Sequence, residues 1–290
     1  MEADFVHWSE NHDTRTIDPN LFYDPVTGYN KNPSLGRPNP AYGQIAYFVS
    51  TGKRDAALLS TAINRRFQKN FQGGLTYTLM FSMHDDGTIG YTAPGQNNQF
   101  NYLDGEYATS TDFQRNTLRA WTLYRLPWGF TSSVSYFYGS GNRFAASVAA
   151  AVYGKPGTNR LNLTAAGGAT TAIVIPSSAT LANGDVIPVA ARFHGPGTIN
   201  SGDTIPRDAL EGLPLHKVDL RLTKEIPIGS TVKVSLIGEV YNLFNHHNYG
   251  SYNTSLSSSA ATTALFGRPQ QNTGNAYVPR EAQLAFRIGF

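Results

Sequence analysis

The feature that most constrains this chain is a regular alternation of apolar and polar side chains, which places each kind on its own face of an extended strand. The clearest alternating segment is 217–224. Its apolar positions are Val218, Leu220 and Leu222, and its polar positions are Lys217, Asp219, Arg221 and Thr223. The alternation predicts an all-β fold, and helical periodicity is nearly absent.

Two further segments alternate in the same way. In 231–244 the apolar face carries Val232, Val234, Leu236, Val240 and Phe244, and the polar face carries Lys233, Ser235, Glu239 and Tyr241. At the C-terminus, Ala282, Leu284, Phe286, Ile288 and Phe290 alternate with Glu281, Gln283, Ala285, Arg287 and Gly289. Segments 55–67, 71–83, 116–126 and 129–138 fit less cleanly, and 5–8 is the end of one more strand. The chain therefore contains about eight strands.

The connections between these strands alternate strictly between short and long. Tight turns rich in Gly, Pro or Asn are expected at 68–70, 127–129 and 227–230, and long loops at about 10–54, 85–113, 141–213 and 245–278. In an antiparallel meander, this order places every tight turn at one end of the sheet. Outer-membrane barrels show this asymmetry, whereas compact soluble domains rarely contain such long loops. A soluble β-sandwich with one elaborated end is the alternative.

The segregation of charge supports a wall that faces lipid. A tilted spanning strand needs about 9–11 residues, and soluble strands usually have about 5–6. Charged side chains on the lipid face cost about 2–4 kcal/mol at the bilayer midplane. The polar residues expected to face a wet lumen are Lys217, Asp219, Arg221, Lys233, Glu239 and Arg287. An ordinary sheet with one face in solvent also explains this alternation.

Aromatic residues gather near the ends of the predicted strands. Those expected to form girdles at the membrane boundaries are Trp128, Phe130, Tyr136, Tyr138, Tyr241 and Phe244. Core aromatics that flank turns are the alternative interpretation.

Composition excludes several other classes of protein. There is no Cys, which excludes a disulfide scaffold, a thiolate zinc site and a Cys nucleophile. The net charge is +3, with Lys and Arg scattered rather than clustered, so we expect no nucleic-acid partner. No apolar run is long enough for a spanning helix, and the N-terminus does not resemble a signal peptide.

Candidate chemical sites are weak. Adjacent His246 and His247 would point to opposite faces of a strand, so they are a poor metal chelate. Asp85 and Asp86 together with Asp104 and Glu106 lack the spacing of an EF-hand. Asp208 and Glu211 are a possible carboxylate pair, but nothing in the sequence sets their separation. We therefore expect no enzyme, no metal and no cofactor.

Two regions remain open to more than one role. The basic residues Arg65, Arg66, Arg119 and Arg125 lie near the tight-turn end, either inside the lumen or among lipid headgroups. The segment 141–213 is rich in Ala, Gly, Thr and Pro, and is expected to form an extracellular hairpin or lid.

The end of the chain resembles the C-terminal signal by which outer-membrane proteins are recognised for barrel assembly. This signal would comprise Leu284, Phe286, Ile288 and Phe290. A wider resemblance runs through Asn-Arg-Arg-Phe at 64–67, Leu-Pro-Trp-Gly-Phe at 126–130, Lys-Val-Asp-Leu-Arg-Leu at 217–222 and Glu-Val-Tyr-Asn-Leu-Phe-Asn at 239–245. In this order, the motifs resemble the C-terminal part of the barrel in TonB-dependent outer-membrane receptors, especially the Oar-like group with a carboxypeptidase-regulatory-like domain.

The resemblance implies a partial antiparallel up-and-down transmembrane β-barrel with long extracellular loops, located in the outer membrane. It implies uptake of a bulky solute such as a metal chelate or an oligosaccharide. The expected partners are membrane lipid and the barrel-assembly machinery. A plug domain and TonB box are not found in 1–290, so TonB would act only through a part of the receptor outside it. A complete small barrel serving as an anchor or adhesin, and a secreted glycan-binding β-sandwich, are the alternatives.

Overall fold

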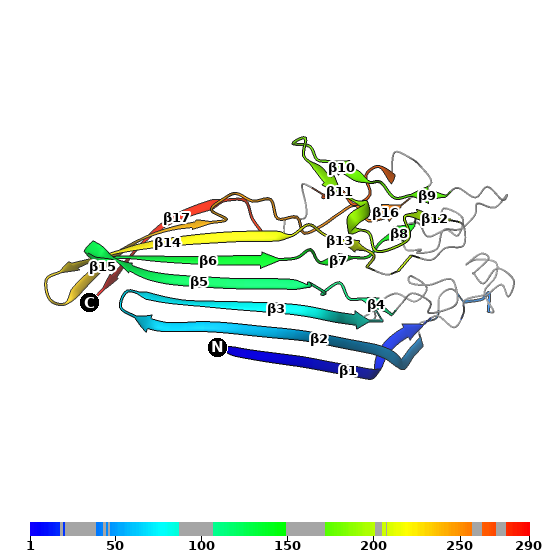
Figure 1. Cartoon of the computed structure of the whole chain (residues 1–290), viewed down its shortest axis with the longest axis horizontal. Coiled ribbons are helices and arrows are strands. Elements are labelled where there is room, and N and C mark those ends of the chain that lie inside the picture. The colour runs from blue at the N-terminus through cyan, green and yellow to red at the C-terminus, as the bar shows by residue number, and fades with distance from the viewer. Residues whose placement is uncertain are drawn as a thin grey trace.

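The fold is seen in a computed structural model that describes residues 1–17, 20, 39–42, 45, 47–86, 107–148, 172–200, 205–206, 208–256, 263–270 and 277–290. Its dominant feature is one antiparallel sheet of eight long strands, which lie side by side in chain order (Figure 1). The short β4 (Ala108–Thr109) pairs with β3 beside this path. The strands are β1 (Glu2–Ile17), β2 (Tyr47–Gln68), β3 (Phe71–Asp85), β5 (Asn116–Leu126), β6 (Phe130–Gly139), β14 (Leu215–Ile228), β15 (Val232–Tyr241) and β17 (Glu281–Gly289). The predicted all-β antiparallel fold is confirmed.

Within the part of the chain that the structure describes, the sheet has two free edges. β1 pairs only with β2, β17 pairs only with β15, and the two edge strands lie on opposite sides of the sheet (Figure 1). The sheet is therefore an open arc rather than a closed barrel.

The predicted asymmetry of the connections is confirmed for the described residues. Tight turns join β2 to β3, β5 to β6 and β14 to β15 at one end, and both chain termini lie at that end (Figure 1). Left-handed backbone makes these turns possible, with φ of 56° at Lys69, 60° at Trp128, 74° at Gly129 and 68° at Gly229. The turn at Pro127–Gly129 is a single 3₁₀ turn. The long connections all leave from the opposite end.

Two predicted boundaries are wrong. Residues 10–54 were expected to be a loop, but β1 continues to Ile17 and β2 already begins at Tyr47. The ladder continues through Glu10 opposite Arg54, whose guanidinium lies 3.8 Å from the carboxylates of both Glu10 and Asp13. Residues 10–14 are polar on both faces of β1, and 47–49 are apolar on both faces of β2, so neither segment shows the alternation that predicts a strand.

The other wrong boundary is the end of β15, which was expected at Phe244 and lies at Tyr241. Asn242 takes a φ of 49°, and its side chain bonds the backbone of His246, where Nδ2 donates to the carbonyl oxygen at 3.0 Å and Oδ1 accepts from the amide at 3.0 Å. These two bonds close a turn and end the strand.

The described parts of the loops 141–213 and 245–278 fold together into one unit, here called the loop cap, at the end of the sheet away from the tight turns (Figure 1). Four small two-stranded sheets build it, pairing β7 (Arg143–Phe144) with β13 (Leu210–Glu211), β8 (Ser147–Val148) with β16 (Ser255–Leu256), β9 (Ile173–Val174) with β12 (Thr198–Ile199), and β10 (Ser178–Thr180) with β11 (Val186–Pro188). Its core contains Val189, Ile199, Leu210, Leu256 and Phe266, all with no exposed area. The main buried apolar core of the described chain therefore lies in its loops.

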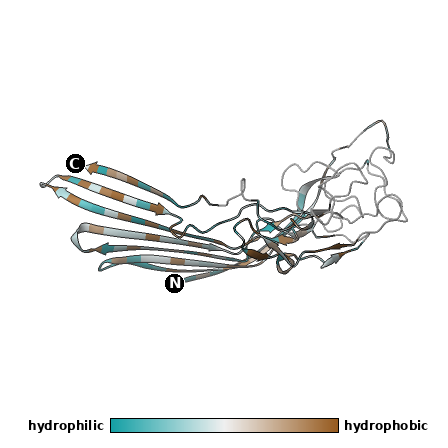
Figure 2. Cartoon of the chain, turned by 90° about the horizontal axis from the view of Figure 1, so that it is seen from above, coloured by the Kyte–Doolittle hydropathy of each residue, from teal (hydrophilic) through white to brown (hydrophobic). Residues whose placement is uncertain are grey.

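The two faces of the main sheet differ in polarity. Figure 2 shows hydrophobic and hydrophilic residues alternating as bands along the strands nearest the C-terminus. The apolar face of β17 is open, with Leu284 91% and Phe286 74% exposed. Among the described residues, no helix is long and apolar enough to cross a bilayer.

Candidate functional site

The polar face of β14, β15 and β17 carries a connected network of side chains. Register places Arg221 opposite Glu239, and Glu239 opposite Gln283. Arg221 Nη1 lies 3.3 Å from Glu239 Oε1, and Gln283 Nε2 donates to Glu239 Oε2. Tyr241 also reaches Glu239, with its hydroxyl 3.3 Å from Oε2. Glu239 thus receives contacts from three neighbouring strand positions.

A second group on the same face lies nearer the loop cap. Lys217 Nζ lies 3.0 Å from Asp219 Oδ2 and lies over the rings of Tyr241 and Tyr277, at 5.7 and 5.3 Å from their centroids. The edge of Tyr277 meets Phe137, with ring centroids 5.7 Å apart. The group therefore combines charge with aromatic surface, a combination that suits polar solutes carrying apolar parts.

The structure brings together four of the six polar candidates. Lys217 and Asp219 form one pair, and Arg221 and Glu239 form another, while Lys233 and Arg287 follow on the same face towards the tight turns. That this face lines a water-filled lumen remains a prediction.

Sequence reasoning missed two members of this face, Phe137 and Tyr277. The alternation placed Gln283 on the polar side of the last strand, but Gln283 was not among the residues expected to line the lumen. Phe137 lies among serines on the polar face of β6, and Tyr277 comes from the loop before β17. No periodicity in the sequence predicts that a loop residue lies on a sheet face, so the position of Tyr277 could not be predicted.

The aromatic girdle candidates divide between several positions. Trp128 is 83% exposed at the tip of the β5–β6 turn, and Phe130 follows it at the start of β6. Tyr136 and Tyr138 lie towards the loop end of β6, where both contact His216. Tyr241 lies on the polar face, and Phe244 is exposed beyond the end of β15.

The basic residues near the tight turns lie over aromatic rings. The guanidinium carbon of Arg125 is 4.2 Å from the ring centroid of Phe67, and that of Arg65 is 5.4 Å from that of Phe71. The expectation for Arg119 was wrong: it pairs with Phe137 near the loop end of β5 and β6, and its guanidinium carbon lies 5.4 Å from the centroid of that ring.

One buried arginine holds the loop cap together. Arg192 is 7% exposed and donates to three backbone carbonyl oxygens, from Nε to Pro188 at 2.6 Å, from Nη1 to Glu211 at 2.8 Å and from Nη2 to Gly267 at 2.8 Å. Burial lowers the pKa of Arg192 below its usual value, although an arginine pKa starts so high that the group stays charged at neutral pH. Because Pro188 and Gly267 belong to different loops, Arg192 locks the two loops together.

The candidate carboxylate pair is part of the same structural unit. Glu211 Oε2 lies 2.8 Å from His194 Nε2 and 3.4 Å from Arg143 Nη1, and Asp208 is buried in the loop cap. Glu211 thus makes an ion pair with Arg143 and a hydrogen-bond contact with His194, and both contacts lie within the cap.

The candidate metal ligands do not converge in the described part of the chain, where no group of three His, Asp or Glu side chains could hold a metal ion. His246 hydrogen-bonds towards Asn248, whereas His247 stacks on Tyr249. Asp86 accepts from the backbone amide of Lys53. Asp104 and Glu106 lie outside the described residues.

The residues of the predicted assembly signal share one face of β17. Leu284, Phe286 and Ile288 are all exposed there, and Phe290 is exposed at the end of the chain. Recognition of these residues by an assembly machinery remains a prediction.

A single antiparallel sheet with one exposed apolar face, one charged face and tight turns at one end defines the class of membrane-spanning β-sheet proteins. A family model described as an outer membrane beta barrel domain matches residues 4–283. The chain belongs to this family of outer-membrane β-barrels, and its location is the cell outer membrane. No curated protein matches the chain.

Proposed function

We propose that this chain is part of the barrel of a TonB-dependent receptor that takes up a bulky solute, either a metal chelate or an oligosaccharide. The proposal rests on the order of the motifs at 64–67, 126–130, 217–222 and 239–245, which is similar to that in the C-terminal barrel of such receptors. A transport role, rather than catalysis, fits a site made of ion pairs and aromatic rings.

The observation that carries the proposal is the open arc of eight strands. A closed barrel of about eight strands has an interior just wide enough to be filled by its own side chains, whereas transporters of about 22 strands enclose a plugged lumen. Here β1 and β17 lie on opposite sides of the sheet with free edges. An open sheet with two unpaired edge strands is what a segment of a wider barrel would have.

The charged face supplies a path for the solute under this proposal. The pairs Lys217–Asp219 and Arg221–Glu239 keep polar groups along the strands, and Tyr241 and Tyr277 add aromatic surface nearer the loop cap. The barrel-assembly machinery would insert the chain, and TonB would act through a plug domain outside this segment.

A second candidate function is display of a binding surface at the cell exterior. It is favoured by the loop cap, whose buried core and Arg192 contacts make it a folded unit rather than a set of loose loops. An anchor or adhesin would need such a unit, and it would not need TonB.

Cross-linking and uptake separate these two functions. We expect the protein, in its native outer membrane, to cross-link to TonB. We also expect uptake of radiolabelled ferric desferrioxamine or of maltohexaose to fall when the gene is deleted or a protonophore is added. Absence of a TonB cross-link would show that the transport proposal is wrong. Loss of cell adhesion on deletion would then support the anchor.

A variant tests the role of the polar face in uptake. Glu239→Gln keeps the size of the side chain but removes the charge that pairs with Arg221, so we expect slower uptake with normal amounts of protein in the membrane. Glu225→Gln is the matched control. Glu225 lies on β14, on the same polar face of the sheet as Glu239, but closer to the tight turn. Equal uptake by both variants would argue against a solute path along this network.

A further inference from the structure

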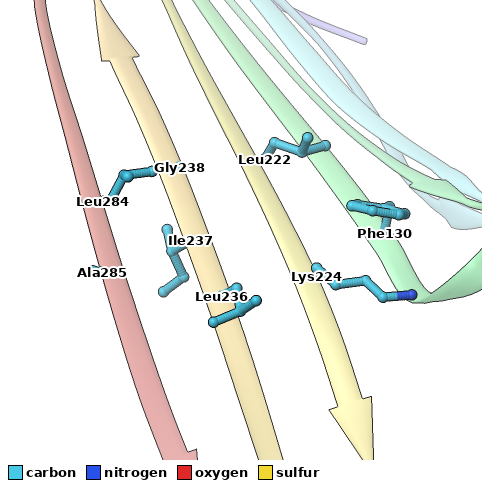
Figure 3. A pocket seen from close by; sticks show the side chains of 8 residues that line it. All are labelled: Phe130, Leu222, Lys224, Leu236, Ile237, Gly238, Leu284 and Ala285. Atoms are coloured by element: carbon cyan, nitrogen blue, oxygen red, sulfur yellow. The ribbon is translucent and has the colours of Figure 1, made fainter.

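The apolar face of the sheet contains a groove that crosses β14, β15 and β17 (Figure 3). Its volume is about 420 Å³, and the residues that shape it are Phe130, Leu222, Lys224, Leu236, Gly238 and Leu284. Sites for small ligands typically have volumes of about 300–1,000 Å³. The groove is therefore large enough to hold part of a ligand, and its walls are apolar.

The register of the strands explains why the groove exists. Gly238 lies opposite Leu222 on one side and opposite Leu284 on the other, so two leucines flank a position that has no side chain. A Cβ added at Gly238 would meet only Leu284 Cδ2, at an ordinary contact distance of 3.6 Å. Leu236 and Phe130 close the groove on the side of the tight turns (Figure 3). The missing side chain at Gly238 therefore leaves space between the side chains of Leu222 and Leu284.

One cation stands at the tight-turn end of this groove. Lys224 is the only Lys, Arg, Asp or Glu on the apolar face of β6, β14, β15 and β17, strands that the structure describes in full. Its Nζ lies 4.7 Å from the ring centroid of Phe130 and donates to the carbonyl oxygen of Trp128 in the β5–β6 turn. The charge therefore bends away from the apolar surface towards the membrane boundary, as long basic side chains do at helix and strand ends.

We propose that this groove binds an acyl chain of an anionic glycerophospholipid whose phosphate pairs with Lys224. The location in the outer membrane means that lipid covers this face, and the groove offers an acyl chain more contact than a flat wall does. A single partly exposed cation at the tight-turn end of the groove selects for negative charge. The proposal depends on the membrane location and is independent of TonB-dependent uptake.

Native mass spectrometry measures this binding directly. The protein is purified from outer membranes, reconstituted in nanodiscs of equal parts palmitoyl-oleoyl phosphatidylglycerol and phosphatidylethanolamine, and released in mild detergent. We expect the natural protein to retain phosphatidylglycerol preferentially. Gly238→Leu fills the groove and should abolish retention, whereas Ala120→Leu adds the same side chain to the apolar face of β5 and should not.

A second variant tests the charge without changing the groove. Lys224→Gln should lower the preference for phosphatidylglycerol over phosphatidylethanolamine about fivefold, because one cation near an anionic lipid contributes about 1 kcal/mol. Lys233→Gln removes a charge from the opposite face at a neighbouring height and should leave the preference unchanged. Equal retention of lipid by Gly238→Leu and Ala120→Leu would overturn the proposal. Equal retention of the two lipids by the natural protein, or a dimer mass that Gly238→Leu abolishes, would also overturn it.

Discussion

At the scale of single residues, position in the fold decides what a charge does. Arg192 is buried and satisfied by three carbonyl oxygens, so its role is structural. Arg221, by contrast, is half exposed on the polar face and pairs with Glu239 alone. Both are isolated arginines in the sequence, and only their surroundings distinguish them.

Replacing Arg192 should loosen the loop cap. Arg192→Met leaves one buried and two partly buried carbonyl oxygens without their donor, which we expect to cost about 3 kcal/mol. Hydrogen exchange of the amides of Val189, Phe193 and Gly267 should then become about a hundredfold faster. Arg221→Met is the control, with a cost below about 1 kcal/mol because Arg221 is half exposed and Glu239 keeps its contacts with Tyr241 and Gln283. Unchanged exchange at Gly267 in Arg192→Met would contradict the locking role.

Tyr107 gives a residue-scale prediction about pH. Burial first, and then its hydrogen bond to Asp55, raise the pKa of Tyr107 to about 12, from an ordinary value of 10.0. A raised pKa means that the folded state holds the proton more tightly. The contribution of this contact to stability is therefore complete below about pH 10 and is lost as the pH rises towards 12.

Ultraviolet absorbance of phenolate measures this titration. The difference between the natural protein and Tyr107→Phe should show one tyrosine ionising near pH 12 rather than near pH 10. Addition of denaturant should shift that titration down to the ordinary value. A difference spectrum that already titrates near pH 10 in the folded protein would show that the contact with Asp55 is absent.

At the scale of elements, the tight turns and the two-faced strands follow local rules. The turns need left-handed backbone, which glycine adopts without the steric cost that other residues bear. The strands need continuous backbone pairing, with apolar side chains on one face and polar side chains on the other. Short stretches of sequence are enough to meet both requirements, which is why the predicted turns and most of the predicted strands are confirmed.

Two turn glycines separate backbone strain from crowding. Gly129 and Gly229 both have left-handed backbone, with φ of 74° and 68°. A Cβ at Gly129 would lie 2.9 Å from the carbonyl oxygen of Glu225, whereas a Cβ at Gly229 would meet no atom within 4 Å. We expect Gly229→Ala to cost about 1 kcal/mol through φ alone, and Gly129→Ala to cost more. Urea unfolding in lipid vesicles measures both. Equal costs would mean that the β5–β6 turn relaxes away from β14.

A charge placed on the apolar face of β14 tests its contact with lipid. Leu220→Arg should lower the free energy of unfolding in vesicles by about 2–4 kcal/mol if it lies near the midplane. Thr223→Arg places the same side chain on the polar face of the same strand, and should cost less than about 1 kcal/mol. A smaller penalty for Leu220→Arg than for Thr223→Arg would reverse the assignment of the two faces.

At the scale of the whole molecule, the main sheet is open, whereas the described parts of the loops enclose a core. β1 and β17 each present a row of unpaired backbone groups, and in hydrocarbon each unpaired group costs several kcal/mol. The loop cap, in contrast, buries an apolar core of its own among the described residues. We therefore expect both sheet edges to be paired in the membrane, either with each other or with further strands.

Hydrogen exchange in the native membrane tests this expectation. Backbone amides along β1 and β17 should be as protected as those of the central β14, because both edges are paired there. Exposed amides of the β10–β11 hairpin tip, such as that of Asn183, serve as the unprotected reference. Fast exchange along alternate amides of β17 would show that this edge stays open in the membrane.

The sequence by itself determined the all-β class, the antiparallel order with tight turns at one end, and the separation of Lys217, Asp219, Arg221 and Glu239 from the apolar face. These features depend on a period of two and on turn residues, which are local properties. Only the tertiary structure decided that Tyr277 joins the polar face, that Arg192 locks two loops, that β1 extends to Ile17 and that Gly238 opens a groove. Each of these depends on which segments meet across the sheet or between loops. Contacts between segments that are distant in the sequence produce no repeating pattern of residues from which they could be predicted.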